Sequence, residues 1–232
     1  MIHDADDALT STINIMNTTP THQALKQSTN YQEIQSRRPL DAIFTAKSIA
    51  VIGASESPHS VGRTLMENLM HGCSGGEVFP INPNRVSILG AKAYHSVLDV
   101  PVALDLAVIA TRAAIVPEVV RHCAQAQLPG AIIISAGFKE LGADGAALER
   151  QILETTRKSK MRIIGPNCLG VMMPHTGLNA TFGGAMARSG NVAFLSQSGA
   201  LGTAILDWSQ REQFGFSAFV SVGSMLDVGW GI

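Results

Sequence analysis

The chain has 232 residues, of which 46% are hydrophobic and 15% are charged, and its formal net charge is −1. This length supports one large or two small domains with a buried core, and the chain lacks the basic surplus needed to bind a phosphate backbone, so we expect no nucleic acid partner. It has no run of 18 apolar residues, and Asp4, Asp6 and Asp7 occupy the place of a signal peptide's basic region, so we expect a cytoplasmic protein without membrane contact.

The three cysteines, Cys73, Cys123 and Cys168, are widely spaced and form no C-x-x-C pair. This pattern indicates neither a disulfide framework nor a zinc site, so we expect reduced thiols and no metal. His122 precedes Cys123 inside an expected helix, where core packing or partial exposure explains the pair better than metal binding does.

The first 38 residues differ in character from the rest of the chain. Residues 1–38 are rich in Thr, Asn, Gln and Asp and lack apolar periodicity, which predicts a flexible polar arm. Over residues 41–159, short apolar runs alternate with helical patterns, which is typical of a Rossmann-like, doubly wound α/β domain with a parallel sheet. The expected strands cover residues 48–55, 76–83, 104–111 and 130–138, and the expected helices cover residues 61–71, 117–127 and 144–160.

A second unit is expected over residues 160–232. It contains the segment "MRIIGPNCLGV", a glycine-rich stretch over residues 181–191, a strand that ends near Ser196, a helix over residues 200–213 and a strand over residues 216–223. An independent α/β domain usually has about 100–150 residues, so this unit is predicted to be incomplete. We therefore expect a partner surface or a further segment to complete it.

Several motifs follow the expected strands, at the edge where parallel α/β sheets bind ligands. The first motif is "VIGASESPHSVG". Its small residues let a ligand phosphate approach the backbone; they are Gly53, Ala54, Ser55 and Gly62. The spacing differs from G-x-G-x-x-G, so a plain strand-to-helix turn explains the motif equally well.

The second expected strand ends in "FPINPNR". A dinucleotide site usually has an acidic residue there to bind the ribose hydroxyls, but Asn82 and Pro83 carry no charge. Arg85 suits an additional phosphate on the ribose, which fits NADP and the 3′-phosphate of coenzyme A alike, while a solvated loop arginine is the alternative. The next two strands end in small residues that leave room for an extended ligand, namely Ala110 and Thr111, and then Ser135, Ala136 and Gly137.

The stretch "VAFLSQSGALG" places two hydroxyls where a strand passes into a helix. Ser196 and Ser198, with the amides at the helix start and Gly199, could form a cradle for an anion, whereas a serine N-cap is the simpler explanation. A nucleophile elbow at Ser198 is disfavoured, because in the usual chain order a histidine follows the serine, and all seven histidines precede it here.

Taken together, seven motifs resemble the CoA-binding N-terminal region of ADP-forming acyl-CoA (acetyl-CoA) synthetases. The same region is similar, more distantly, to the succinyl-CoA synthetase alpha subunit, and it also begins fused protein-lysine acetyltransferases. The motifs stand in the family's order from about Leu40 to the end of the chain, and they are "SIAVIGAS", "FPINPNR", "LDLAVIAT", "GAIIISAGF", "IIGPNCLGV", "GLNATF" and "VAFLSQSGALG".

The resemblance implies a CoA-binding domain followed by an incomplete, flavodoxin-like second domain. It implies that the turn from Gly53 to Gly62 meets the pyrophosphate, that Arg85 meets the nucleotide phosphates, and that the sheet-edge residues complete the CoA site. It also assigns residues around the thiol end, Pro166, Asn167 and Cys168, and residues around a phosphate, Ser196, Gln197, Ser198 and Gly199.

In this family an acyl phosphate forms, a histidine takes the phosphoryl group as the acyl group passes to CoA, and the phosphohistidine regenerates ATP. The resemblance puts that histidine and the nucleotide-binding ATP-grasp domain outside this sequence, since His175 does not match the position. We therefore expect no catalytic residue here, an inactive chain when alone, and an ATP-grasp domain or subunit, with self-association, as partners beside CoA or acyl-CoA.

Two other functions stay open. One is a non-catalytic domain that senses CoA or acyl-CoA in a ligase-like protein acetyltransferase. The other is an NADP-binding oxidoreductase, which is less favoured because the sequence has no Tyr-x-x-x-Lys pair to donate a proton.

Overall fold

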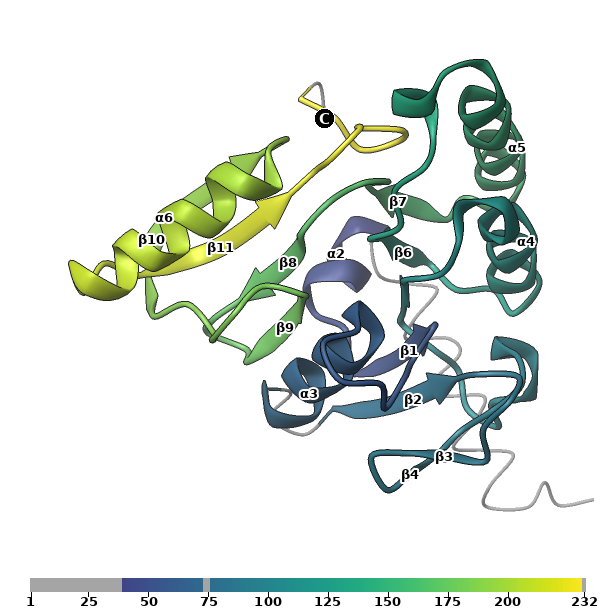
Figure 1. The fold of residues 1–232 in the computed structure, drawn as a ribbon, viewed down its shortest axis with the longest axis horizontal. Helices are drawn as coiled ribbons and strands as arrows, with labels where there is room; N and C mark the ends of the chain where they lie inside the picture. The colour runs from purple at the N-terminus through teal and green to yellow at the C-terminus, as the bar shows by residue number, and fades with distance from the viewer. Residues whose placement is uncertain (1–38, 73–75, 231–232) are drawn as a thin grey trace, which may run out of the picture.

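A computed structural model describes residues 39–72 and 76–230, and these residues form an α/β fold built on two main sheets (Figure 1). The predicted polar arm, residues 1–38, lies outside the described residues. The expected α/β fold with a parallel central sheet is confirmed.

The first sheet has five parallel strands in the order β2-β1-β5-β6-β7. Nearly every position of its three central strands is buried, which explains why the sequence shows continuous apolar runs instead of alternation. The strands are β1 (Ser48–Ile52), β2 (Glu77–Ile81), β5 (Leu106–Ile109), β6 (Gly130–Ile133) and β7 (Arg162–Ile164).

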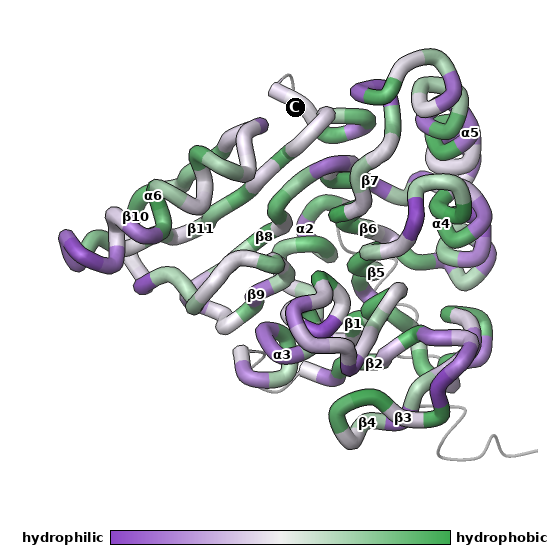
Figure 2. The backbone as a smooth tube through the Cα atoms, viewed as in Figure 1, coloured by the Kyte–Doolittle hydropathy of each residue, from purple (hydrophilic) through white to green (hydrophobic). Residues whose placement is uncertain are grey.

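Helices cover both faces of this sheet. The helices α4 and α5 pack on the face that holds Ala50 and Ile52, whereas α2, α3 and the second sheet pack on the face that holds Ile49 and Val51. Figure 2 shows the resulting pattern, with hydrophobic colour along the central strands and hydrophilic residues on the outer turns of α5. The helices are α2 (Pro39–Phe44), α3 (Val61–Gly72), α4 (Val116–Gln125) and α5 (Ala143–Ser159).

The segment between β2 and β5 has no α-helix. It forms a short hairpin and a 3₁₀ turn, whose N-cap Ser96 is reciprocally bonded with Asp99. This capping box explains why so short a helix begins there. The elements are β3 (Ser87–Ile88), β4 (Ala91–Lys92) and η1 (Val97–Asp99).

The second sheet has the order β10-β11-β8-β9, with β10 and β11 parallel and the other pairs antiparallel. The predicted helix and the two strands beside it are present, but the hairpin of β8 and β9 was not expected. Its turn needs a positive φ of 75° at Gly177. The elements are β8 (Gly170–Met173), β9 (Leu178–Thr181), β10 (Ser189–Ser196), α6 (Gly199–Arg211) and β11 (Phe216–Ser221).

The two sheets share one hydrophobic core. Leu69 of α3, Leu178 of β9 and Val220 of β11 belong to the same buried cluster, and Asn68 Nδ2 donates to the carbonyl oxygens of Thr181 and Gly183 at 2.8 and 3.1 Å. The strand β7 pairs with β6 in the first sheet, although the sequence assigned its residues to the second unit. A division between residues 159 and 160 therefore does not follow the sheet boundary, because a fifth strand completes the first sheet after that point.

Across residues 39–72 and 76–230, no helix combines the length and the apolar character needed to cross a membrane.

We predict that Gly145→Ala destabilises the fold by about 1–3 kcal/mol, because the added Cβ would overlap the carbonyl of Phe138 at the start of α5. Urea denaturation should show a lower midpoint with an unchanged slope. Gly184→Ala is the matched control, since nothing lies within 4 Å of its added Cβ, and it should shift the free energy of unfolding by less than about 0.5 kcal/mol. Equal midpoints for the two variants would contradict the packing argument.

Candidate functional site

The predicted ligand residues of the first sheet all follow the carboxyl ends of its strands. Because these strands are parallel, the loops after β1, β2, β5, β6 and β7 come together at one edge. The chain first crosses from β1 outward to β2 and then returns to the other side of β1 for β5. The position between β1 and β5 is therefore the topological switch point, where open α/β sheets bind ligands.

The turn after β1 depends on close backbone approach. Gly53 has a φ of 90°, and a Cβ there would overlap the carbonyl of Ala110. A Cβ at Gly62, on the first turn of α3, would overlap the carbonyl of Gly53. Both positions therefore require glycine, while Ala54 is fully buried and Ser55 is half-buried. The turn thus brings the backbones of β1, β5 and α3 close together.

Asn82 ties the end of β2 to this turn. Its Nδ2 donates to the carbonyl oxygen of Ala54 at 2.9 Å, and its Oδ1 accepts from the amide of Asn84 at 2.8 Å. The side chain thus joins the loops after β1 and β2, and an ionised acidic side chain could not make the first of these bonds because it has no N–H to donate to Ala54. Pro83 and Arg85 are exposed beside it, and Arg85 forms no ion pair within the described part of the chain, so its guanidinium is available to a ligand.

Ser135 connects the ends of β5, β6 and β7. Its Oγ accepts from the amide of Thr111 at 3.0 Å, and its carbonyl oxygen accepts from the amide of Asn167 at 2.9 Å. The structure therefore brings together three loops that the sequence had predicted separately. Ala110 and Thr111 are half-buried at this edge, and Ala136 is exposed.

The amide of Gly137 already has an acceptor within the chain. It donates to Glu140 Oε1 at 2.7 Å. Partial burial acts to raise the pKa of Glu140, but hydrogen bonds from backbone amides, with that of Gly137 foremost, and the charge of Lys139 outweigh it and lower the pKa. Glu140 is therefore ionised at neutral pH and holds the loop after β6 in place.

The segment after β7 buries two of its three predicted residues. Pro166 and Cys168 are buried and Asn167 is exposed. The thiol of Cys168 donates to the carbonyl oxygen of Ile133 at 3.3 Å, and burial raises its pKa to about 12. The thiol thus faces the core, and the groups that this segment presents at the surface are those of Asn167 and the backbone.

The predicted anion cradle lies next to the same segment. A Cβ at Gly199 would come within 3.7 Å of the Leu169 side chain, and the amide of Leu169 donates to Ser221 Oγ at 3.0 Å. The cradle therefore adjoins the loop after β7, although it belongs to the second sheet.

The cradle hydroxyls already make local hydrogen bonds. Ser196 Oγ accepts from the amide of Ser198 at 3.0 Å, and Ser198 Oγ accepts from the amide of Leu201 at 3.2 Å as the N-cap of α6. Gln197 is exposed, and the amide of Gly199, at the start of the 13-residue helix, has no acceptor among the described residues. The simpler explanation, a serine cap, is therefore correct for Ser198, and it leaves the first amides of α6 able to bind an anion.

A pocket of about 210 Å³ opens at the switch point. This is below the roughly 300–1,000 Å³ of pockets that enclose a whole drug-sized ligand, so it suits one ring system. Apolar side chains form most of it, and the polar residues on its wall include three that the sequence did not single out as ligand residues, His95, Ser96 and His122. The apolar residues are Ile52, Ile81, Val97, Ile115 and Val119.

His122 was predicted to be a packing or half-exposed residue, and its Nε2 lies 2.9 Å from Glu118 Oε1. Its neighbour Cys123 is fully buried, and burial raises the pKa of that thiol to about 12. No group of three or more potential metal ligands forms within residues 39–72 and 76–230. The sequence singled out four residues of this pocket, Gly53, Asn82, Pro83 and Thr111, but not His95, Ser96 and His122, because these three lie before η1 and on α4 and not directly after a strand.

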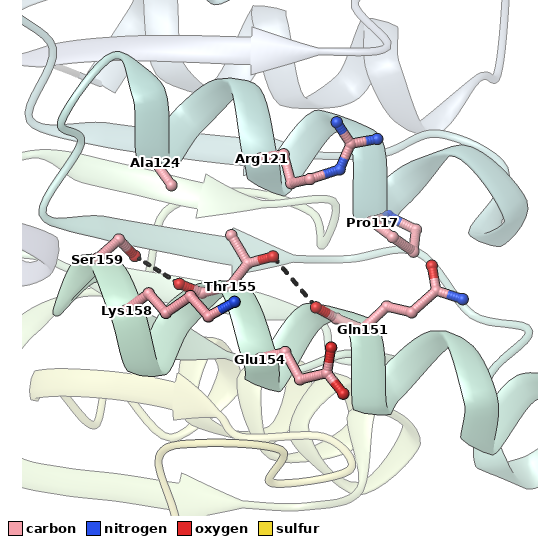
Figure 3. A pocket seen from close by; sticks show the side chains of 8 residues that line it. All are labelled: Pro117, Arg121, Ala124, Gln151, Glu154, Thr155, Lys158 and Ser159. Carbon is pink, nitrogen blue, oxygen red and sulfur yellow. Dashed lines mark hydrogen bonds between the residues drawn. The ribbon is translucent and has the colours of Figure 1, made fainter.

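A larger hollow of about 590 Å³ lies between α4 and α5 (Figure 3). None of the predicted site residues contributes to it. Its hydroxyls are already bonded within the helix, since Thr155 Oγ1 donates to the carbonyl oxygen of Gln151 and Ser159 Oγ to that of Thr155, both at 3.1 Å. Arg121 pairs with Glu118 beside it. This hollow is therefore a weaker candidate than the edge of the first sheet.

Comparison with known proteins gives matches over most of the described chain. Residues 47–174 match the family described as CoA binding domain, and residues 189–231 match the succinyl-CoA ligase like flavodoxin domain. The first match covers more than half of the chain and contains every predicted residue of the first sheet.

Two curated relatives and one solved structure illustrate the similarity. The ADP-forming acetate–CoA ligase I of Archaeoglobus fulgidus is 44% identical over 190 residues, which are 81% of this chain and 27% of the relative. The alpha subunit of ADP-forming acetate–CoA ligase I of Pyrococcus furiosus is 45% identical over 193 residues, which are 82% of this chain and 42% of the relative. The chain thus spans well under half the length of either relative.

The solved structure is the dinucleotide forming acetyl-coenzyme A synthetase 1 of Candidatus Korarchaeum cryptofilum, in complex with phosphate and ADP. It is 40% identical, with a TM-score of 0.79, over 82% of this chain and 41% of that one. The resemblance inferred from the seven motifs is confirmed.

We predict that Ser198→Ala lowers stability by about 1 kcal/mol, because the amide of Leu201 loses its capping acceptor. Ser198→Asp should keep most of the stability, since a carboxylate also caps a helix N-terminus. Urea denaturation of the two variants and the parent checks this. Equal loss in both variants would show that the cap is not what the hydroxyl contributes.

We also predict that Cys123 and Cys168 resist iodoacetamide in the folded chain at about pH 8, although an ordinary thiol with a pKa of about 8.5 reacts there. Both thiols are buried, and a pKa of about 12 keeps them neutral. Peptide mapping by mass spectrometry after alkylation, with and without urea, gives the modified fraction at each cysteine. Rapid modification of Cys168 without urea would contradict the inward orientation of its thiol.

Proposed function

This chain belongs to the family of CoA-binding domains, and we propose that it is the CoA-binding portion of an ADP-forming acid–CoA ligase. The proposed overall reaction converts acetate or a similar acid, CoA and ATP into acyl-CoA, ADP and phosphate. The observation that carries the proposal is the continuous edge of five loops after parallel strands, in a chain that is 44% identical to a ligase of this activity.

The nucleotide end of CoA is proposed to lie at the switch point. The apolar pocket of about 210 Å³ has room for the adenine ring but not for the whole cofactor. The glycine turn beside it allows the pyrophosphate to approach the backbone, because no Cβ projects from Gly53. Arg85, exposed after β2, is positioned to attract the phosphates of the ribose.

The pantetheine arm is proposed to extend along the edge from β5 toward β7. Small residues follow β5 and β6, and the bond between Asn167 and Ser135 aligns the next loop with them. The thiol would then reach the region of Asn167, beside the first turn of α6. The free amides of that turn are proposed to hold a phosphate, which is the group that must lie near the thiol when an acyl phosphate reacts.

The remaining chemistry is proposed to come from outside residues 39–230. His175, the described histidine nearest in sequence to the cradle, has its Nε2 at 2.8 Å from the carbonyl oxygen of Gly190, and the resemblance does not assign it the phosphoryl group. An ATP-grasp domain or subunit would supply the nucleotide site. The P. furiosus relative is named an alpha subunit, which supports a partner chain for this protein as well.

We predict that CoA binds to this chain and that Arg85→Glu weakens the affinity by about tenfold or more, because a repulsive carboxylate replaces the cation that faces the phosphates. Isothermal titration calorimetry measures both affinities. Arg150→Glu reverses the charge at an exposed position of α5, a helix that carries none of the predicted site residues, and this control should bind CoA as the parent does.

Binding of NADPH without any response to CoA would overturn the assignment in favour of an oxidoreductase. A sensor domain would bind CoA equally well. If the chain were such a sensor, no phosphohistidine would form on any subunit after addition of the ATP-grasp component, ATP and acetyl-CoA. If the chain is part of a ligase, a phosphohistidine must form under these conditions.

A further inference from the structure

The segment from Val222 to Val228, here called the clasp, leaves the second sheet and returns to the first. In Figure 1 it is the yellow segment that leaves β11 and turns toward β7. At its start the amide of Val222 donates to the carbonyl oxygen of Ser196 at 2.9 Å, so the clasp begins beside the anion cradle. None of its residues was predicted from the sequence to belong to a site.

The clasp runs antiparallel to β7, the edge strand of the first sheet, and to the two residues that follow this strand. The amides of Ser224, Leu226 and Val228 donate in turn to carbonyl oxygens progressively earlier in the chain. These acceptors are the carbonyl oxygens of Pro166 at 2.8 Å, Gly165 at 3.0 Å and Ile163 at 3.2 Å. The clasp thus satisfies an edge that would otherwise expose unpaired backbone groups.

One carboxylate fixes the register of this pairing. Asp227 Oδ2 accepts from the amide of Ile163 at 2.8 Å and from Arg162 Nε at 2.9 Å. The Asp227 and Arg162 side chains are only 22% and 28% exposed, so water screens the pair less than it would screen a surface pair. Backbone hydrogen bonds alone would allow the clasp to pair with β7 in more than one register. The Asp227 carboxylate binds at Arg162 and Ile163, so it selects one register.

Two more contacts tie the clasp to the loops around it. A Cβ at Gly223 would overlap the carbonyl of Pro166, so the backbones touch there. Lys139 Nζ, from the loop after β6, donates to the carbonyl oxygen of Ser224 at 2.8 Å. The clasp therefore touches the loops after β6 and β7, which are the two proposed to receive the far end of the pantetheine arm.

We propose that Asp227 is a positioning residue, which locks the clasp onto β7 and thereby holds residues 165–168 in the geometry that receives the thiol end of CoA. This inference rests on the proposed function. Asp227 acts through Arg162 and Ile163 and touches no ligand itself. Since the first residue of the clasp, Val222, is hydrogen-bonded to Ser196, the same lock fixes the spacing between the thiol end and the proposed phosphate position.

The test compares two ligands with the full chain. CoA reaches the clasped loops, whereas adenosine 3′,5′-bisphosphate carries only the nucleotide end and stays at the switch point. In Asp227→Asn, calorimetry should show CoA binding weakened by about tenfold, the size expected for the loss of one charge-assisted hydrogen bond, and bisphosphate binding within about twofold of the parent. Asp207→Asn, on the exposed side of α6, is the matched control and should leave both affinities unchanged.

A merely structural role for Asp227 would weaken both ligands together, and this result, like the absence of any change, would overturn the proposal. Asp227→Glu should restore part of the CoA affinity, because its carboxylate can still accept from Arg162.

A second measurement needs no ligand and remains valid if a variant is less stable. Hydrogen exchange followed by mass spectrometry should show faster exchange in Asp227→Asn for peptides that contain Ile163 and the clasp, with β1 and β5 protected as in the parent. Unchanged exchange at Ile163 would overturn the lock. If the parent chain bound neither ligand, the proposed function would fail, while the exchange result would still decide whether Asp227 locks the clasp.

Discussion

The structure depends on one steric constraint, the absence of a Cβ at the turn after β1. Gly53 and Gly62 allow the backbones of β1, β5 and α3 to come close, because a Cβ at Gly62 would push α3 away from the Gly53 carbonyl and a Cβ at Gly53 would overlap the Ala110 carbonyl after β5. Because α3 also carries Asn68, which binds the second sheet, the same contact determines where that sheet lies. The close contact at these two glycines therefore shapes the proposed ligand edge and also sets the position of α3, on which the second unit packs.

The ligand edge is built by hydrogen bonds between loops. Asn82 joins the end of β2 to that of β1, and Ser135 joins the ends of β5, β6 and β7. In each of these bonds a backbone amide or carbonyl is one of the two partners, so the bonds hold the loops in place. Several predicted site residues thus order the loops, while the free amides of α6 and the guanidinium of Arg85 remain available to a ligand.

The second unit is coupled to the first at both ends. Its hairpin packs on α3, and its clasp pairs with β7, so that the start of α6 lies beside the loop after β7. A site formed by the two units together can bring a thiol and a phosphate close to each other, which either sheet alone could not do. The proposed ligase function relies on such an arrangement.

The sequence by itself determined the fold class, the four main helices to within two residues, and the sheet edge at which the predicted site residues gather. Apolar periodicity and buried runs carry this information locally, since each helix or strand must bury its own face. It also identified the family, because seven short motifs in a fixed order are specific together.

Only the tertiary structure decided the strand order, the membership of β7 in the first sheet, the inward orientation of the Cys168 thiol, the pocket with His95 and His122, and the clasp held by Asp227. Each of these depends on a contact between segments far apart in the chain; Asp227, for example, binds a backbone amide 64 residues earlier. No local pattern encodes such a partner, because a carboxylate that pairs across the fold has the same sequence context as one that is solvated.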